Sequence, residues 1–457
     1  MSRLLRAWIA QRILGLEERP VYIVAQKSSP DRLLSTGAMR TGGERSPTRQ
    51  ERRLGRLRFW LLKLRRSGGD EVPAASATAG MDLGHHPRKG TAMEHALGAR
   101  ELEDPIDSDC TVGLVLTGGT IGAREDDSVL SVGQDPTSAE ADLTSEQWPG
   151  PTRPSVAVRY PIRQLSENLE PQDWLSIADS ICELAEHERI IGALVLHGTD
   201  TMAYTASALS FFLTDIDFPV VLTGSNIPSG QRGSDAARNV HTALIAMRSL
   251  NPGVYVCFAG GSELPGYVYL GTHVRKLRAA GAAFASINRD PVGVVKGEEF
   301  EPIEPYNPMQ HSEGFLLKVD EHVFAIRLYP GLDLDVTFDA IDQGHVRGVV
   351  IELYPSATGP ADTDDPRFSV SRFIRRCTQR DIVVVTTIAE APPTNGKVYE
   401  TTVAINDAGG AFLHDMLPET ATVKLMWALA QSQDPQVVRD LMLRPIAGEL
   451  RAPSQAA

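Results

Sequence analysis

Residues 194–213 read LVLHGTDTMAYTASALSFFL and join an apolar run, a polar glycine turn and a long apolar segment. Leu194–Leu196 continues a β-rich run, whereas Met202–Leu213 has the length and apolar character of a buried helix. The turn His197–Asp200 places a hydroxyl and a carboxylate where the strand passes into the helix. This order predicts a βα unit of a parallel sheet with polar side chains at the carboxyl end of its strand.

Two other segments have the same organisation. Val112–Leu116 leads into a turn of sequence TGGT at 117–120, and Val220–Leu222 leads into TGSN at 223–226. Ligands of open α/β sheets bind at the carboxyl ends of the strands, so we expect the three turns to converge on one crevice. Taken singly, TGGT is explained as a tight turn, and HGTD could equally be a helix N-cap in which Thr199 or Asp200 bonds the first free amides of the helix.

Further along the chain, a second set of strands and helices is expected. The strands are Val323–Leu328, Gly348–Leu353 and Ile382–Ile388, and the helices are Pro418–Ala430 and Pro435–Leu443. The sequence therefore predicts an α/β protein with a larger N-terminal α/β domain at residues 108–300, which has a parallel-type sheet, and a smaller C-terminal α/β domain at residues 315–457.

Residues 1–107 differ from the rest of the chain. They are rich in Arg, Gly, Ser, Pro and Ala without sustained periodicity, which predicts a disordered N-terminal extension. Leu54–Arg66 could form a short basic amphipathic helix that binds a membrane or a partner. A solvated tail, or translation beginning at Met81 or Met93, explains the same composition.

The charge is unevenly distributed. Of 45 basic and 58 acidic residues, 18 and 8 lie before position 92, so the first part carries about +10 and the remainder about −23. An acidic body argues against nucleic acid or an anionic membrane as the main partner and favours a small-molecule substrate.

No apolar run reaches the roughly 20 residues of a spanning helix, and the four cysteines are widely spaced. We therefore expect a cytoplasmic protein. Nucleotide loops and metal-ligand spacings are also missing from the sequence, so we expect no cofactor and no metal.

The polar residues of the turns suit amide hydrolysis, which needs a nucleophile, its activation and donors for the developing oxyanion. Thr120 offers a hydroxyl beside backbone N–H groups, and Thr199 and Asp200 offer a second hydroxyl and a carboxylate. Lys276, expected in a loop after a β-rich run, could activate a hydroxyl, although from spacing alone a solvated surface cluster with Arg275 and Arg278 is the default explanation.

Asp235 and Asn239 are four residues apart on an expected helix. That spacing puts them on one face, and we interpret them as a capping and surface pair rather than as ligands.

Two segments, TGGTI at 117–121 and LVLHGTDTMAYTASALSFFL at 194–213, resemble the signature segments of L-asparaginases. Further similar segments are PVVLTGSNIP at 219–228, SDAARN at 234–239, VRK and AFASIN within 274–288, and HDMLPETATVKL at 414–425. The resemblance covers about residues 111–450. It indicates a divergent member of the asparaginase/glutaminase superfamily, similar to the bacterial cytoplasmic-type enzymes.

This resemblance implies roles for individual residues. Thr120 would be the nucleophile that forms an acyl-enzyme, and Thr199, Asp200 and Lys276 would be a hydrogen-bonded trio that activates a hydroxyl or water. Ser166 and Glu167, together with Thr199 and Asp200, would bind the substrate. The implied reaction is hydrolysis of L-asparagine, with L-glutamine as a second substrate, to the acid and ammonia in a homodimer or homotetramer.

The sequence also departs from the cytoplasmic-type enzymes. Leu165 and Glu167 stand where those enzymes have aspartate and serine, and Thr358 stands where a partner asparagine is expected. The segment Gly122–Arg159 lacks the lid tyrosine.

Two alternative functions therefore stay open. One is the ammonia-generating subunit of a tRNA-dependent amidotransferase, whose extension should be a folded β module, unlike the disordered extension that residues 1–107 predict. The other is an amino-acid-binding or sensing protein with weakened catalysis.

Overall fold

The computed structural model describes residues 111–450 except 120, 122, 127–128, 133–154, 187–189, 230, 260–263, 280–281, 310, 312–313 and 391–397. All of these residues belong to one compact unit of the chain. The expected extension at residues 1–107 lies outside the described residues, as do Met81, Met93 and Leu54–Arg66. None of the described helices is long and apolar enough to cross a membrane.

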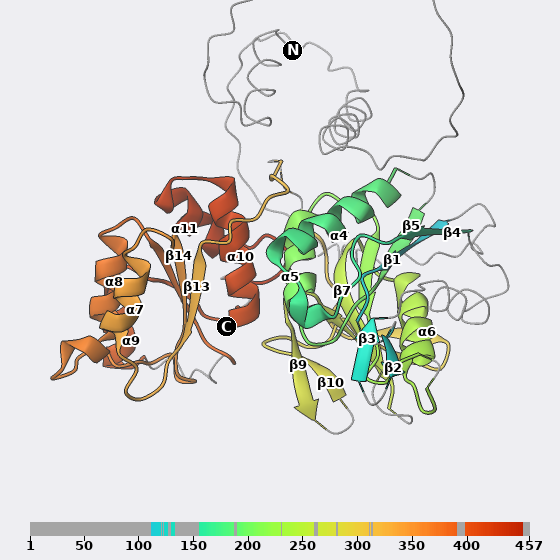
Figure 1. Ribbon diagram of the computed structural model, residues 1–457, viewed down its shortest axis with the longest axis horizontal. Helices are drawn as coiled ribbons and strands as arrows, with labels where there is room; N and C mark the ends of the chain where they lie inside the picture. The colour runs from blue at the N-terminus through green and yellow to red at the C-terminus, as the bar shows by residue number, and fades with distance from the viewer. Residues whose placement is uncertain are drawn as a thin grey trace, which may run out of the picture. The chain divides into compact units, whose positions relative to one another are not determined.

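The N-terminal domain is built on an eight-stranded sheet in the order β12-β11-β8-β7-β6-β5-β1-β4 (Figure 1). The strands are β1 (Thr111–Leu116), β4 (Ser155–Arg159), β5 (Ile190–Leu196), β6 (Pro219–Thr223), β7 (Gly253–Ala259), β8 (Gly266–Leu270), β11 (Gly293–Lys296) and β12 (Glu299–Pro302). Strands β4, β1, β5, β6 and β7 are parallel, while β8, β11 and β12 continue the sheet in antiparallel pairs. The predicted parallel sheet is thus confirmed for the part that carries the glycine turns.

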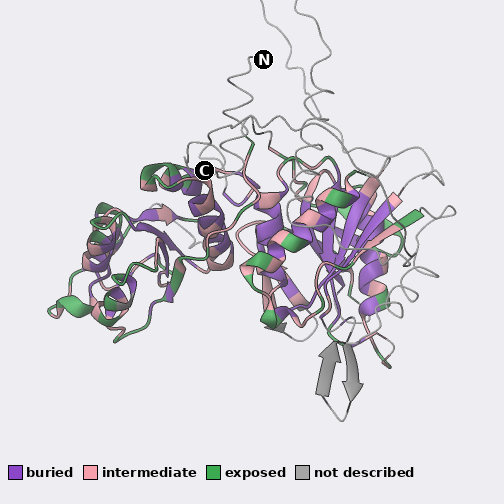
Figure 2. Cartoon of the chain, turned by 45° about the horizontal axis from the view of Figure 1, so that its top comes forward, coloured by how far each residue is buried: buried purple, intermediate pink, exposed green. Residues whose placement is uncertain are grey.

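Helices cover both faces of this sheet. Leu114 and Leu116 pack with α6 (Ala236–Met247), whereas Val115 between them packs with α4 (Pro171–Leu184) and α5 (Met202–Phe212). Successive strand residues face opposite sides, so strands buried on both faces are apolar at nearly every position. Figure 2 shows these central strands as buried. The continuous apolar runs in the sequence follow from this double cover.

The C-terminal domain has a parallel four-stranded sheet in the order β13-β14-β15-β16. Its strands are β13 (Val323–Arg327), β14 (Gly348–Glu352), β15 (Val383–Thr387) and β16 (Ala411–Leu413). Helices α7 (Leu334–Ile341), α8 (Val370–Thr378) and α9 (Glu400–Asp407) share one core with the sheet, and α10 (Pro418–Gln431) and α11 (Pro435–Leu443) share the other. The predicted smaller C-terminal α/β domain is confirmed.

The two domains meet where α5 packs against α10. Phe211 of α5 stacks on Trp427 of α10 with ring centroids 5.6 Å apart, and both side chains are fully buried. Helix α5 is therefore buried on nearly every side, because it is enclosed by the large sheet on one side and by the C-terminal domain on the other.

Smaller elements complete the description. They are the hairpin β2 (Ala123–Asp126) and β3 (Val129–Val132), the hairpin β9 (Val274–Ala279) and β10 (Ala282–Ser286), and the short helices η2 (Ser166–Asn168) and η3 (Pro366–Phe368). Lys276 was expected in a loop but lies within β9. The strand was missed because its sequence, VRKLRA, has no regular alternation of apolar and polar residues.

Candidate active site

Lys276 is the centre of a polar cluster at the carboxyl ends of β1 and β5. Its amine donates a hydrogen bond of 2.7 Å to the Thr199 hydroxyl and lies 2.5 Å from Asp200 Oδ1. Thr199 is only 6% exposed, whereas 63% of the Asp200 side chain is open to solvent. The structure therefore brings together three of the four predicted catalytic residues. The Lys276 amine contacts both the buried Thr199 hydroxyl and the exposed Asp200 carboxylate.

The glycine turns meet beside this cluster. An ideal Cβ added to Gly119 would lie 2.4 Å from Gly198 N, and one added to Gly224 would lie 2.3 Å from His197 O. Only glycine permits such close approach of two backbones. The predicted convergence of the three turns is thus present in the fold, and the backbone of the TGGT turn lies directly against that of the HGTD turn.

Thr120, the predicted nucleophile, lies outside the described residues. Its neighbours are placed: Gly119 has φ +78° and touches Gly198, and Ile121 is 2% exposed. The position of the Thr120 hydroxyl relative to Lys276 stays a prediction.

The two predicted substrate-binding residues of η2 differ in their surroundings. Ser166 is buried, its carbonyl accepts a 2.7 Å hydrogen bond from the Thr201 hydroxyl, and its Oγ lies against Gly198. Glu167, the next residue, is exposed. Ser166 is therefore at the edge of the cluster, whereas none of the contacts that build the cluster involves the Glu167 carboxylate.

His197 is a site residue that sequence reasoning missed. Its ring is buried, with Nδ1 2.7 Å from Gly198 O and Nε2 2.9 Å from Thr205 Oγ1. A carbonyl only accepts, so Nδ1 carries the hydrogen and Nε2 accepts from Thr205. Burial lowers the pKa of His197 to about 4, which keeps the ring neutral and fixes the turn that carries Thr199 to helix α5.

The alternative explanation of Thr199 and Asp200 as a helix N-cap does not hold in the structure. The N-cap of α5 is Thr201, which makes no side-chain capping bond. Both residues instead bond to Lys276.

Asp235 and Asn239 have a structural role, but the expected capping is wrong, because the Asp235 side chain makes no capping bond to α6. Asn239 donates to Gly224 O at 2.7 Å and accepts from Ala259 N at 2.9 Å, while the Asp235 carboxylate accepts from the backbone amides of Asn226 and Ile227. Together they hold the TGSN turn against the end of β7. The expectation of a surface pair is wrong for Asn239, which is fully buried because it bridges two strand ends.

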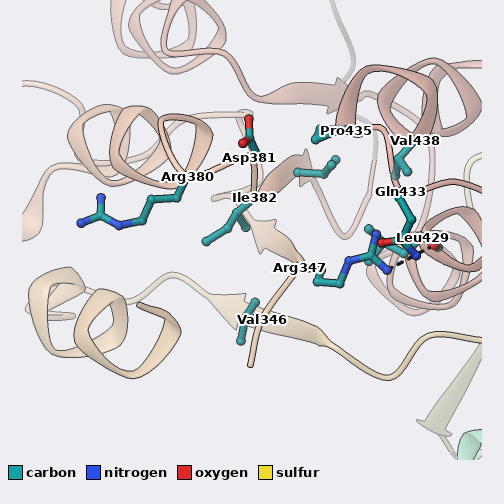
Figure 3. Close-up of a pocket in the computed structure, with 10 residues that line it drawn as sticks. Val346, Arg347, Arg380, Asp381, Ile382, Leu429, Gln433, Pro435 and Val438 are labelled. Atoms are coloured by element: carbon teal, nitrogen blue, oxygen red, sulfur yellow. Dashed lines mark hydrogen bonds between the residues drawn. The ribbon is translucent and has the colours of Figure 1, made fainter. Parts of the chain in front are cut away.

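A separate cavity of about 280 Å³ lies in the C-terminal domain, at the amino ends of β14 and β15. Figure 3 shows Arg347, Asp381 and Gln433 around it. Because the Arg347 guanidinium is already bonded to Asp320 and to the carbonyls of Leu429 and Ser432, its donors are largely used. None of the lining residues belongs to the Lys276 cluster.

No group of three His, Cys, Asp or Glu side chains in the described part of the chain is arranged to hold a metal ion. The Lys276 cluster itself offers one amine, one hydroxyl and one carboxylate, a donor set suited to proton transfer rather than to metal binding.

A hydroxyl held by an amine among converging glycine turns, at the carboxyl edge of a two-domain α/β fold, is typical of amide-cleaving enzymes with hydroxyl nucleophiles. The chain belongs to the asparaginase/glutaminase family. The family model "Asparaginase, N-terminal" matches residues 111–306, and "Glutaminase/Asparaginase C-terminal domain" matches residues 322–442.

Known proteins similar to this chain include amidotransferase subunits and L-asparaginases. A glutamyl-tRNA(Gln) amidotransferase subunit from Saccharolobus solfataricus is 34% identical over 79% of this chain and 80% of its own length. Its counterpart from Saccharolobus islandicus is 36% identical over 63% of this chain and 64% of its own length. The thermostable L-asparaginase from Thermococcus kodakarensis has a similar structure, with a TM-score of 0.63 and 29% identity, over 75% of this chain and 99% of its own.

Proposed function

We propose that this chain is an amidohydrolase that releases ammonia from the side-chain amide of a free amino acid, as the ammonia-generating subunit of a tRNA-dependent amidotransferase. The observation that carries the chemistry is the 2.7 Å hydrogen bond from Lys276 to the buried Thr199 hydroxyl, beside the TGGT turn. The assignment to an amidotransferase is supported by the Saccharolobus solfataricus relative, which is similar over 80% of its own length.

In the proposed reaction, the Thr120 hydroxyl attacks the amide carbon and forms an ester. Its proton passes through Thr199 and Lys276 to the amide nitrogen, which leaves as ammonia. Water, activated by the same pair, then hydrolyses the ester, frees the acid and returns the proton to Thr120. Backbone N–H groups of the glycine turns stabilise the oxyanion in both steps. The scheme requires neither metal nor cofactor.

The substrate's α-amino and α-carboxylate groups would be held by the segment that contains Ser166 and Glu167, next to Thr199 and Asp200. Ser166 lies against Gly198, which supports its part of this assignment. The exposed carboxylate of Glu167 is suited to an ammonium group that enters from solvent.

The charge distribution supports a division of labour with another protein. The residues from position 92 onward carry about −23, which disfavours direct binding of tRNA phosphates by this domain. A tRNA would therefore be held by a separate basic subunit, to which this chain supplies ammonia. We further propose that this chain forms a homodimer or homotetramer and that the tRNA-binding subunit associates with this oligomer.

A second candidate function is L-asparaginase activity without a partner. It is favoured by the Thermococcus kodakarensis enzyme, whose chain is covered over 99% of its length.

The two functions differ in what the purified chain does alone. A coupled ammonia-release assay should be run on L-glutamine, L-asparagine and their D-isomers, with the chain alone and with any protein that co-purifies. Release from glutamine that rises with a tRNA-binding partner supports the amidotransferase role. Release from asparagine at full rate by the isolated chain contradicts it and favours the second candidate.

Site variants test the chemistry separately. Thr199→Val and Lys276→Met should each abolish ammonia release while the fold stays intact. Lys296→Met is the matched control. Lys296 also pairs with a carboxylate, that of Glu301, at 2.5 Å, but it lies on β11, away from the glycine turns. If Thr199→Val keeps most of its rate, the proposed roles are wrong. Thermal stabilisation by an amino acid without ammonia release would indicate a sensing protein.

A further inference from the structure

The hairpin that carries Lys276 is not part of the large sheet. Among the described strands, β9 pairs only with β10 (Figure 1), and its link to the eight-stranded sheet is through side chains: Phe284 of β10 packs on Phe258 of β7. A two-stranded hairpin is marginally stable by itself in water. The place of the amine over Thr199 must therefore be set by contacts outside the hairpin.

One such contact is made by the residue next to Lys276. Because successive strand residues face opposite sides, Arg275 and Lys276 point in opposite directions. Lys276 faces Thr199, while Arg275 makes a two-point ion pair with Glu419 in the first turn of α10, at 2.9 and 2.7 Å. The hairpin is thus held between the glycine turns and the C-terminal domain.

The second contact is made by His273, one residue before β9. Its buried ring places Nδ1 2.9 Å from Ile287 O and Nε2 2.9 Å from Gly448 O, and the His273 carbonyl accepts from Ile287 N at 2.8 Å. Ile287 directly follows β10. A single ring therefore joins both ends of the hairpin to the C-terminal segment of the chain.

That segment is itself rigidly held. The Glu449 carboxylate accepts from the amides of Ile446 and Ala447, and it pairs at 2.5 Å with Lys424 of α10. Both charged side chains are completely buried, where an ion pair is screened little and its partners cannot be exchanged for water. Gly448 O is consequently a fixed acceptor for the His273 ring.

We propose that His273 is a positioning residue for Lys276, through which the C-terminal segment sets the distance between the catalytic amine and the Thr199 hydroxyl. This inference rests on the proposed amidohydrolase function, since it assigns a role to Lys276. Burial lowers the pKa of His273, whereas two carbonyl acceptors would be satisfied together only by the doubly protonated ring. A neutral ring donates to only one of them, and the proposal requires the tautomer whose Nε2 donates to Gly448 O, while Ile287 stays joined to His273 by its backbone bond. An amide side chain can replace the bond to Gly448 O.

The experiment compares His273→Leu and His273→Gln with the wild-type full chain. Ile374→Val is the control, because it also removes buried contacts from the C-terminal domain but lies on α8, away from the hairpin. A shift of 1 Å at a reacting group can lower the rate about 100-fold. We expect kcat for ammonia release to fall about 10- to 100-fold in His273→Leu with a KM close to that of the wild type, and to recover partly in His273→Gln.

Hydrogen–deuterium exchange provides a measurement that does not depend on turnover. Deuterium uptake over residues 274–288 should rise in His273→Leu and stay at the wild-type level in Ile374→Val. An unchanged kcat, or unchanged uptake over 274–288, would overturn the proposal. Should His273→Leu fail to fold, Thr272→Val is the second variant, because it removes a neighbouring bond to the C-terminal segment, from the Thr272 hydroxyl to Ala447 O at 3.3 Å. It should lower kcat and raise uptake over 274–288 by smaller amounts.

Failure of the two proposals can be told apart. A wild-type chain that releases no ammonia from any amide contradicts the proposed function. Uptake over residues 274–288 still decides whether His273 fixes the hairpin in that case.

Discussion

Gly119 is the residue at which the contact between two turns can be broken with one methyl group. Gly119→Ala adds a Cβ that would lie 2.4 Å from Gly198 N and 2.5 Å from Gly198 Cα, both backbone atoms that no side-chain rotation can move. Ordinary contacts of this kind begin at 3.4 Å. The TGGT and HGTD turns must therefore separate by about 1 Å, a displacement that can lower a rate about 100-fold.

The same substitution also strains the backbone, because Gly119 has φ +78°. A left-handed conformation costs a residue with a side chain about 1–2 kcal/mol, and overpacking adds about 1–3 kcal/mol. Gly344 is the matched control: its φ is +83° and an added Cβ would meet no atom within 4 Å. Gly344→Ala should thus lower the free energy of unfolding only by the cost of the left-handed backbone, and its rate of ammonia release should stay at the wild-type value.

Urea unfolding and the ammonia-release assay on both variants separate the two effects. We expect both proteins to be folded at 25 °C, Gly119→Ala to be the less stable, and only Gly119→Ala to lose about 100-fold in kcat. If Gly119→Ala is folded and its kcat lies within about threefold of the wild-type value, less than 1 kcal/mol in the barrier, the contact of the turns does not build the site.

Three further predictions concern the rest of the molecule. Burial lowers the pKa of His197 from 6.5 to about 4. Between pH 6.5 and pH 4, therefore, His197 is protonated in the unfolded chain but neutral in the folded one. The free energy of unfolding should therefore fall by about 3 kcal/mol from pH 6.5 to pH 4, and His197→Gln should flatten a pH series of urea unfolding in that window. Glu449→Gln leaves the buried Lys424 charge unpaired and should cost about 3–5 kcal/mol in urea unfolding, much of which Lys424→Met in the same chain should restore. Deletion of residues 1–92 should leave the rate of ammonia release unchanged, and a loss of rate or solubility would show that this segment belongs to the catalytic unit.

The sequence predicted those parts of the fold whose cause is local. Strands β1, β5 and β6 and helix α5 were found because burial on both faces leaves a continuous apolar run, and a glycine turn marks the end of each strand. The antiparallel half of the sheet was missed. A strand carries no local signal of the direction of its neighbour, so β8, β11 and β12 could not be oriented in advance.

The candidate site shows the same limit. Thr199 and Asp200 were identified from their own turn, whereas Lys276 approaches them from 77 and 76 positions away in the chain. Spacing could not distinguish it from Arg275, and only the resemblance to L-asparaginases singled it out. His197 was overlooked because its partners, Gly198 O and Thr205, become visible only when the strand-to-helix turn is built.

The position of Lys276 also determines how much of the chain is needed for a complete site. Thr199, Asp200 and the three glycine turns belong to the large sheet, but the amine stands on a hairpin held through Arg275 by α10 and through His273 by the C-terminal segment. The N-terminal domain alone would keep the hydroxyl and the packing of Val274 and Phe284 in its core, but it would lose both contacts of the hairpin with the C-terminal part of the chain. Proton transfer falls off steeply when donor and acceptor leave hydrogen-bond distance, so the smallest unit able to hold this site is the pair of domains together.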